Sequence, residues 1–347
     1  MDVQSPNEPK SPEPRGRRAI AAPQLGMLGR RTRDTLMTYV GVVTVLAALI
    51  IFFSTTQSSF FTYDNFLNIL DTNAVLLVLS IGLTFTLLVG GFDLSIGGVL
   101  ALSGVVLAKL LQNGVPTGVA MLIVLLGACL FAGIAVNGFT IARLGVNFFV
   151  VTLGVLAISR GIGLAITNGA SQGLYEEKFL RDVGSYRIGG DIPMPVVIGL
   201  FVLVLAILVL RYTGYGRMVY AVGGNAEAAR LAGINVTLVK LSAYAISALL
   251  AGLAGIIEAG RLAAAAPDTD VGIELTAAAA VLLGGTSFVG GQGTMFGTFL
   301  GVVFLGVLQN GLIISSISIY YQGVISGAVL IASVTIDRLR RVRAGAA

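Results

Sequence analysis

Several polar side chains lie within long apolar stretches of this 347-residue sequence. Ionisable groups are costly in a hydrocarbon environment, so each is expected to be paired, hydrated or part of a path for a solute. Side-chain amides and hydroxyls donate and accept hydrogen bonds without adding a fixed charge, which suits the hydroxyls of a neutral polyol. The residues that could form such a path are Asp93, Ser95, Asn137, Asn147, Arg160, Gln309, Asn310 and Gln322.

Two of these residues have a second interpretation. The Asp93 carboxylate is expected to accept hydrogen bonds from backbone N–H groups at a helix start, and the alternative is contact with a polyol hydroxyl. The presence of Arg160 in an apolar segment has three explanations: a structural ion pair, a side chain that extends to water, or contact with the solute. Catalysis is not indicated, because histidine is absent and Cys129 is the only cysteine. We therefore expect no Cys/His metal site, no disulfide and no histidine base.

The elements that position these groups are expected to be membrane-spanning helices. The sequence is 56% hydrophobic and only 11% charged, whereas soluble proteins carry about 25% charged residues. Ten apolar segments follow one another between Leu36 and Ile336, and their lengths favour helices over the strands of a barrel. The predicted fold is an all-α, polytopic helical bundle of about ten spans. The third and eighth segments, Ile96–Leu111 and Leu275–Gly285, are short and bordered by glycine pairs.

The ends of the sequence and its charges predict the topology. Residues 1–34 are rich in Pro, Ser and Arg and are expected to form a disordered basic cytoplasmic tail. Residues 35–340 form the transmembrane domain, and residues 341–347 a cytoplasmic C-terminal tail. With both termini in the cytoplasm, most of the 22 Lys and Arg residues fall on that side of the membrane. The net charge of +5 then needs no nucleic-acid partner to explain it.

A similar spacing of two glycine pairs occurs twice along the chain. Gly90-Gly91 precedes Gly97-Gly98, and Gly284-Gly285 precedes Gly290-Gly291. Paired, interrupted apolar segments of this kind mark the translocation site of many transporters. Close packing of helices through small residues is an equally good explanation.

The predicted cytoplasmic loop Arg211–Lys240 contains a short helix that could dock on a partner protein. Asn225 is a good N-cap, Glu227 complements the helix dipole, and Gly233 is placed to end the helix in a left-handed conformation. The alternative is a connector lying on the membrane surface. The docking residues are predicted to be Gly223, Gly224, Asn225, Glu227, Ala228, Ala229, Arg230, Gly233 and Ile234.

These features together resemble the ribose-type sugar permeases of bacterial ATP-binding-cassette (ABC) importers, within the branched-chain amino acid/ribose permease superfamily. Glu227-Ala228-Ala229 followed by Gly233 is similar to the EAA loop of importer permeases. The resemblance covers roughly residues 36 to 340. Further matching motifs are Gly90-Gly-Phe-Asp-Leu-Ser-Ile-Gly97, Thr152-Leu-Gly154, Arg160-Gly161, Leu283-Gly-Gly-Thr-Ser287, Gly290-Gly291 and Asn310-Gly-Leu312.

The resemblance implies a non-enzymatic translocation subunit in the bacterial cell (inner) membrane. Its implied partners are a cytoplasmic ABC ATPase, an extracytoplasmic solute-binding protein, a second permease subunit and a neutral sugar. The sequence has no Walker A motif, so ATP is expected on the partner ATPase and no cofactor on this chain. Two alternatives stay open: a permease for a nucleoside or branched-chain amino acid, and an ion-coupled secondary transporter.

Overall fold

The computed structural model describes residues 25–174, 178–318 and most of 321–335, the exceptions in that last range being 322, 326, 330, 333 and 334. Gln322, residues 1–24 and the predicted tail 341–347 lie outside the described residues. The first helix, α1 (Leu25–Thr56), begins inside the stretch predicted to be a disordered tail. For residues 25–34 that prediction differs from the structure, because Leu, Met and Arg are strong helix formers and extend the membrane helix at its N-terminal end.

The described chain is helical apart from four two-residue strands, which confirms the predicted all-α bundle. β1 (Gln172–Gly173) pairs with β4 (Ala264–Ala265), and β2 (Arg187–Ile188) pairs with β3 (Ile192–Pro193), both antiparallel. After α1 the helices are α2 (Tyr63–Thr72), α3 (Ala74–Leu88), α4 (Ile96–Gln112), α5 (Thr117–Gly127), the π-helix η1 (Ala128–Arg143), α6 (Phe148–Thr167), α7 (Lys178–Ser185), α8 (Met194–Tyr212), α9 (Gly214–Gly224), α10 (Ala226–Leu231), α11 (Val236–Leu262), α12 (Ile273–Leu283) and α13 (Met295–Ile314).

Five helices of the described chain are long and apolar enough to cross a membrane, and the bent pair α2–α3 makes a sixth if it is one span. The other predicted segments in the described part lie on the 32-residue α1 and on two shorter apolar helices, Ile96–Gln112 and Ile273–Leu283. The 11 residues of α12 extend only about 16 Å at 1.5 Å per residue, about half of a 30 Å hydrocarbon core. The predicted count of about ten thus includes one helix, α12, that is too short to cross on its own.

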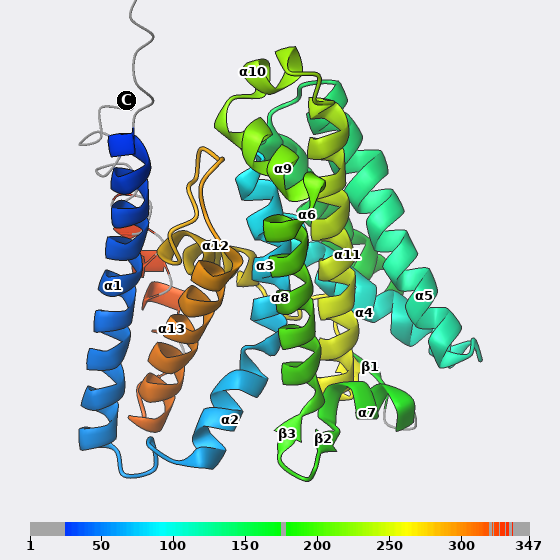
Figure 1. Ribbon diagram of the computed structural model, residues 1–347. Coiled ribbons are helices and arrows are strands. Elements are labelled where there is room, and N and C mark those ends of the chain that lie inside the picture. The colour runs from blue at the N-terminus through cyan, green and yellow to red at the C-terminus, as the bar shows by residue number, and fades with distance from the viewer. Residues whose placement is uncertain are drawn as a thin grey trace, which may run out of the picture.

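Two helices form the centre of the bundle. Every residue of α3 is buried, and α11 packs against η1, α3, α4 and α7. Small residues let the backbones approach: a Cβ atom on Gly133 of η1 would lie 2.8 Å from the Cα atom of Ala245 on α11. Figure 1 shows α10 at one end of the bundle, with α7 and the pair β2–β3 at the opposite end.

Glycine pairs interrupt the bundle at the two places where the sequence repeats them. Residues 89–95 separate α3 from α4, and the loop 284–294 separates α12 from α13. In Figure 1 this loop rises from α12 toward the end that carries α10, and α13 runs back toward the other end. We refer to 88–96 and 284–294 as the two interrupted segments.

Candidate functional site

The predicted docking helix is present as α10, with the expected caps. The Asn225 side chain accepts a hydrogen bond from the Ala228 N–H at 2.9 Å. Gly233 ends the helix with φ +85°, and its N–H donates to the Arg230 carbonyl oxygen at 3.0 Å. The Ile234 N–H donates to the Ala229 carbonyl oxygen at 3.0 Å. These local bonds hold a short helix rigid although it is far too short to be stable alone.

One face of α10 packs against the bundle and the other is open. Ala229 is buried, while Glu227 and Arg230 form an exposed ion pair at 2.8 Å. Leu231 is 82% exposed, and the sequence analysis did not select it. The sequence feature that could have identified Leu231 is its position two residues after Ala229, since residues two apart on a helix point in different directions. Leu231 is therefore a large apolar side chain that the open face of α10 offers to a partner.

A buried polar cluster surrounds Asp93 in the first interrupted segment. The Asp93 carboxylate is 0% exposed and accepts hydrogen bonds from the Ser95 N–H at 3.0 Å and the Ser95 hydroxyl at 2.5 Å. Its other oxygen accepts from the Ser247 hydroxyl of α11 at 2.8 Å. The Asn137 amide of η1 donates to the Ser95 hydroxyl at 2.8 Å. Asp93 therefore bonds the backbone beside a helix start, the first of its two interpretations.

The same cluster contains polar atoms that lack a protein partner. The Asn137 Oδ1 atom and the Tyr244 hydroxyl are buried without one. Tyr244 lies against Gly91, where a Cβ atom would overlap its hydroxyl oxygen. Three of the predicted pathway residues, Asp93, Ser95 and Asn137, are thus brought together, and Tyr244 and Ser247 join them unpredicted because they come from α11, far along the chain.

Arg160 forms an ion pair with Glu274. Its Nη2 atom lies 3.8 Å from the Glu274 Oε2 atom, and both atoms lack hydrogen-bond partners. Glu274 is 7% exposed, and a Cβ atom on Gly97 would overlap its carboxylate. The pair therefore joins α6 and α12 against the first turn of α4. This places Arg160 in a structural pair, one of the alternatives given for it above.

The predicted amides do not form one site. Asn147 caps α6 by accepting from the Phe149 N–H at 2.9 Å. Asn310 exchanges hydrogen bonds with Asn65 at 2.9 and 3.0 Å, which joins α13 to α2. Gln309 is half-buried on α13. Asn147 and Asn310 are therefore accounted for by local and interhelical bonds.

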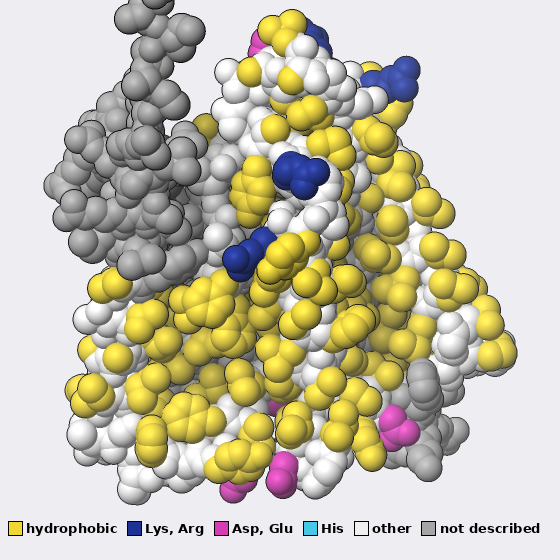
Figure 2. Space-filling view, viewed as in Figure 1, with side chains coloured by type: hydrophobic (Ala, Val, Ile, Leu, Met, Phe, Trp, Pro, Cys, Tyr) yellow, Lys and Arg dark blue, Asp and Glu magenta, His cyan; other side chains and the backbone are white. Residues whose placement is uncertain are grey.

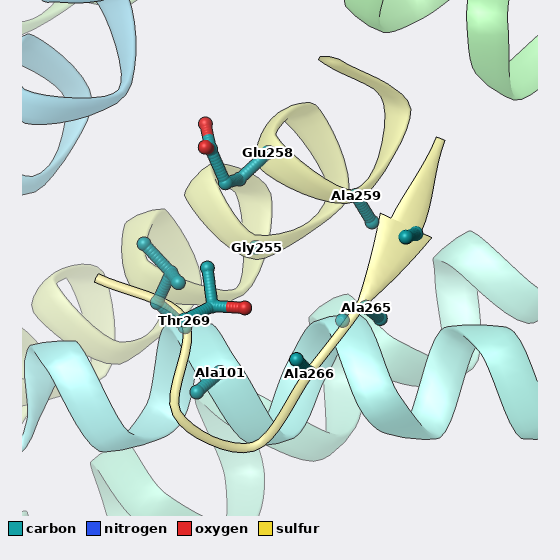
Figure 3. Close-up of a pocket in the computed structure, with 10 residues that line it drawn as sticks. Ala101, Gly255, Glu258, Ala259, Ala265, Ala266 and Thr269 are labelled. Carbon is teal, nitrogen blue, oxygen red and sulfur yellow. The ribbon is translucent and has the colours of Figure 1, made fainter. Parts of the chain in front are cut away.

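A small pocket lies beside Glu258, where α4, α11 and the chain after β4 meet (Figure 3). Its volume of about 10 Å³ admits no more than a water molecule. A larger cavity of about 270 Å³ lies between α4, α5, η1 and α6, with an apolar lining that includes Val99, Phe131 and Ile162. The first is too small for a polyol and the second is lined mainly by apolar side chains, so neither fits a sugar.

Charged residues gather at the end of α11 and in the chain that follows it. Arg261 donates to the Glu258 carboxylate at 2.8 Å. Burial raises the pKa of Asp270, and the nearby Arg261 and Arg160 lower it by less. A carboxyl group whose folded-state pKa lies above its unfolded value stabilises the fold at low pH, and this contribution is lost as pH rises.

Asp270→Asn should therefore make stability less dependent on pH above the ordinary carboxyl pKa of 3.8. The wild type loses stability as pH rises through the raised pKa, whereas the amide does not titrate. Asn also tolerates the left-handed backbone of this position, where φ is +51°. Thermal unfolding in detergent from about pH 4 to about pH 7 measures the effect. The matched control is Asp268→Asn, at an exposed position; parallel pH curves for wild type and Asp270→Asn would contradict the expectation.

Comparisons with known proteins give the family of this chain. The family model described as "Branched-chain amino acid transport system / permease component" matches residues 65–334. The ribose import permease protein of Escherichia coli (strain K12) is 40% identical over 320 residues, which cover 90% of this chain and 98% of that protein. The D-allose transport system permease protein of the same organism is 38% identical, covering 86% and 91%.

A more distant organism gives the same result. The ribose import permease protein of Bacillus subtilis (strain 168) is 37% identical over 307 residues, covering 88% of this chain and 94% of that protein. No solved structure matches the protein significantly. The matched region contains α10, both interrupted segments and the Arg160–Glu274 pair. This chain therefore belongs to the branched-chain amino acid transport system permease family, as a multi-pass membrane protein.

Proposed function

We propose that this protein is the permease subunit of an ATP-driven ABC importer that carries a monosaccharide into the cell. The observation that carries the proposal is α10, a capped helix that projects Leu231 away from the bundle. The names of the relatives support the solute class, since they describe import of ribose and D-allose. The family description names branched-chain amino acid transport, but the relatives that match most of this chain are named for ribose and D-allose, which favours a sugar. None of these names indicates a nucleoside or coupling to an ion gradient.

In this mechanism α10 seats in a cytoplasmic ATPase that the chain itself does not contain. ATP binding and hydrolysis on the ATPase displace α10, and the bundle changes between outward-open and inward-open states. A solute-binding protein delivers the sugar from outside. The pathway lies at the interface with a second permease subunit, identical or different.

The distribution of charge supports the proposed orientation. Figure 2 shows Lys and Arg side chains in the half of the molecule nearer α10, with Asp and Glu gathered mainly at the opposite end. A broad hydrophobic surface separates them, as expected for a protein whose middle contacts lipid. Positive charge favours the cytoplasmic side. This supports a cytoplasmic position for α10, where an ATPase can reach it, and an outward position for the end with α7 and β2–β3, facing the binding protein.

Leu231→Asp should abolish capture of an ATPase by the tagged chain purified in mild detergent. An apolar anchor seated in a partner groove contributes about 2 kcal/mol or more, and a buried, unpaired carboxylate adds a desolvation penalty. The measurement is mass spectrometry of the co-purified proteins. The matched control is Leu262→Asp at the far end of α11, where the side chain is 55% exposed; it should capture as much ATPase as the wild type.

Other outcomes would contradict the proposal. Well-folded wild-type protein that captures no ATPase, with solute uptake that follows an imposed ion gradient, would indicate a secondary transporter. Equal capture by wild type and Leu231→Asp would remove α10 from the docking surface. Loss of capture by Leu262→Asp alone would place the docking surface at the opposite end of the bundle.

A further inference from the structure

Five glycines from three segments that are distant in sequence meet at one place in the bundle. They follow α3 (Gly90), end α9 (Gly223 and Gly224) and lie between α12 and α13 (Gly290 and Gly291). The Gly291 N–H donates a hydrogen bond to the Leu88 carbonyl oxygen at 2.9 Å. We call these five glycines the glycine junction.

The backbones of the glycine junction touch with no side chain between them. A Cβ atom on Gly290 would lie 2.8 Å from the Gly90 nitrogen, and one on Gly291 would lie 2.6 Å from the Gly224 nitrogen. A Cβ atom on Gly223 would overlap the Leu88 carbonyl oxygen and lie 2.5 Å from the Gly291 nitrogen. Contacts this close cannot adjust by rotating side chains, so a shift of one backbone displaces the others.

A second bond reinforces the contact between α9 and the loop 284–294. The Tyr220 hydroxyl of α9 donates to the Gly293 carbonyl oxygen at 3.0 Å. On its other side the junction continues directly into the docking helix, because Gly224 is followed by Asn225, the N-cap of α10. No flexible linker separates the docking helix from the junction.

Both interrupted segments lead from the junction to the buried polar groups. Beyond Gly90 lies Asp93, bonded to Ser247 of α11. The loop that holds Gly290 and Gly291 is preceded by α12, whose first turn carries Glu274, the partner of Arg160. A displacement at the junction therefore reaches both segments at the same time.

We propose that the glycine junction transmits movement of α10 to both interrupted segments, and that Gly223 and Tyr220 are the positioning residues of this link. The inference rests on the proposed docking of an ATPase on α10. In this proposal, direct backbone contact links the movement of α10 to the two interrupted segments, and a general tilting of the spans is not required.

The test compares two adjacent glycines with opposite surroundings. Gly223→Ala inserts a methyl group into the Leu88 carbonyl, whereas the methyl group of Gly224→Ala enters open space. Both variants leave α10 and its exposed Leu231 unchanged, so both should capture the ATPase. The reporter is a thiol from Val289→Cys, at an exposed position of the loop 284–294, in a Cys129→Ser background. Its labelling rate with a maleimide is measured in the purified ATPase complex with and without ATP.

We expect ATP to change the labelling rate by about tenfold in the wild-type and Gly224→Ala complexes, within the range typical of coupling between sites. In Gly223→Ala the response to ATP should be lost while the ATPase is still captured. Tyr220→Phe adds no bulk and should weaken the response several-fold, which keeps the test decisive if Gly223→Ala does not fold.

Two results would overturn the inference. One is an equal response to ATP in Gly223→Ala and Gly224→Ala, or in Tyr220→Phe and wild type if Gly223→Ala does not fold. The other is a wild-type complex in which ATP leaves the thiol of the loop unaffected. Failure of the wild type to capture any ATPase is a separate result, because it refutes the proposed function rather than the link inside the bundle.

Discussion

Replacing Glu274 with alanine should lower the free energy of unfolding by about 3 kcal/mol, because it leaves the Arg160 guanidinium without its partner. This is the lower end of the range for a broken buried pair, since the Arg160 side chain is 19% exposed and the atoms are 3.8 Å apart. Glu274 also lies at the first turns of α12 and α4, whose N-terminal dipoles favour a negative charge. Unfolding by a denaturing detergent in mixed micelles gives the free energy.

A double-mutant cycle separates the ion pair from the loss of packing. The double variant Arg160→Ala/Glu274→Ala should recover part of the loss, because it removes the uncompensated charge. Glu274→Gln keeps the shape of the side chain and controls for volume. If the effects of Arg160→Ala and Glu274→Ala simply add in the double variant, the two residues do not interact and the pair has no structural role.

Asp93→Ala should lower the free energy of unfolding by about 2 to 4 kcal/mol, since it strips a buried backbone N–H and two hydroxyls of their acceptor. The groups affected are the Ser95 N–H, the Ser95 hydroxyl and the Ser247 hydroxyl. Asp93→Asn keeps one oxygen as an acceptor and can donate to Ser247, so its loss should be smaller. The same mixed-micelle titration measures both variants.

Transport by Asp93→Asn distinguishes the two interpretations of this carboxylate. If Asp93 is structural, uptake of the transported sugar per folded importer should stay close to the wild-type rate. If uptake falls to background while the unfolding curve stays close to that of the wild type, the carboxylate contacts the solute. The second result would contradict a purely structural role for the buried cluster.

Features specified by neighbouring residues were predictable from the sequence. Asn225 and Gly233 define α10 because N-caps and left-handed C-terminal residues act within one helical turn. The short third and eighth segments were predicted from their bordering glycines, and α4 and α12 are shorter than the full spans. Local chemistry therefore predicted the short helix α10 and the interruptions.

Features that depend on tertiary contacts were not predictable. The ion pair between Arg160 and Glu274 was not predicted, because nothing local relates two residues more than a hundred positions apart. The repeated glycine pairs at Gly90 and Gly290 were recognised in the sequence, but their contact in space was not predicted. The contact of Gly290 with Gly223 was not predicted either. The first helix was predicted to begin after residue 34, whereas α1 begins at Leu25. The arginines of this stretch indicated a disordered tail, although the same stretch contains helix-forming residues.

The π-helix η1 bears on how the protein is made. Long runs of π-helical bonding are rare and poorly stable alone, and η1 lies along α11 through Gly133 and Gly138. The ribosome delivers the chain from its N-terminus, so η1 enters the membrane well before α11 exists. During that interval we expect residues 128–143 to hold ordinary α-helical bonds, and to take their final form only when α11 arrives. Asn137, which lies within η1 and donates to the Ser95 hydroxyl, would then join the buried cluster only after α11 has arrived.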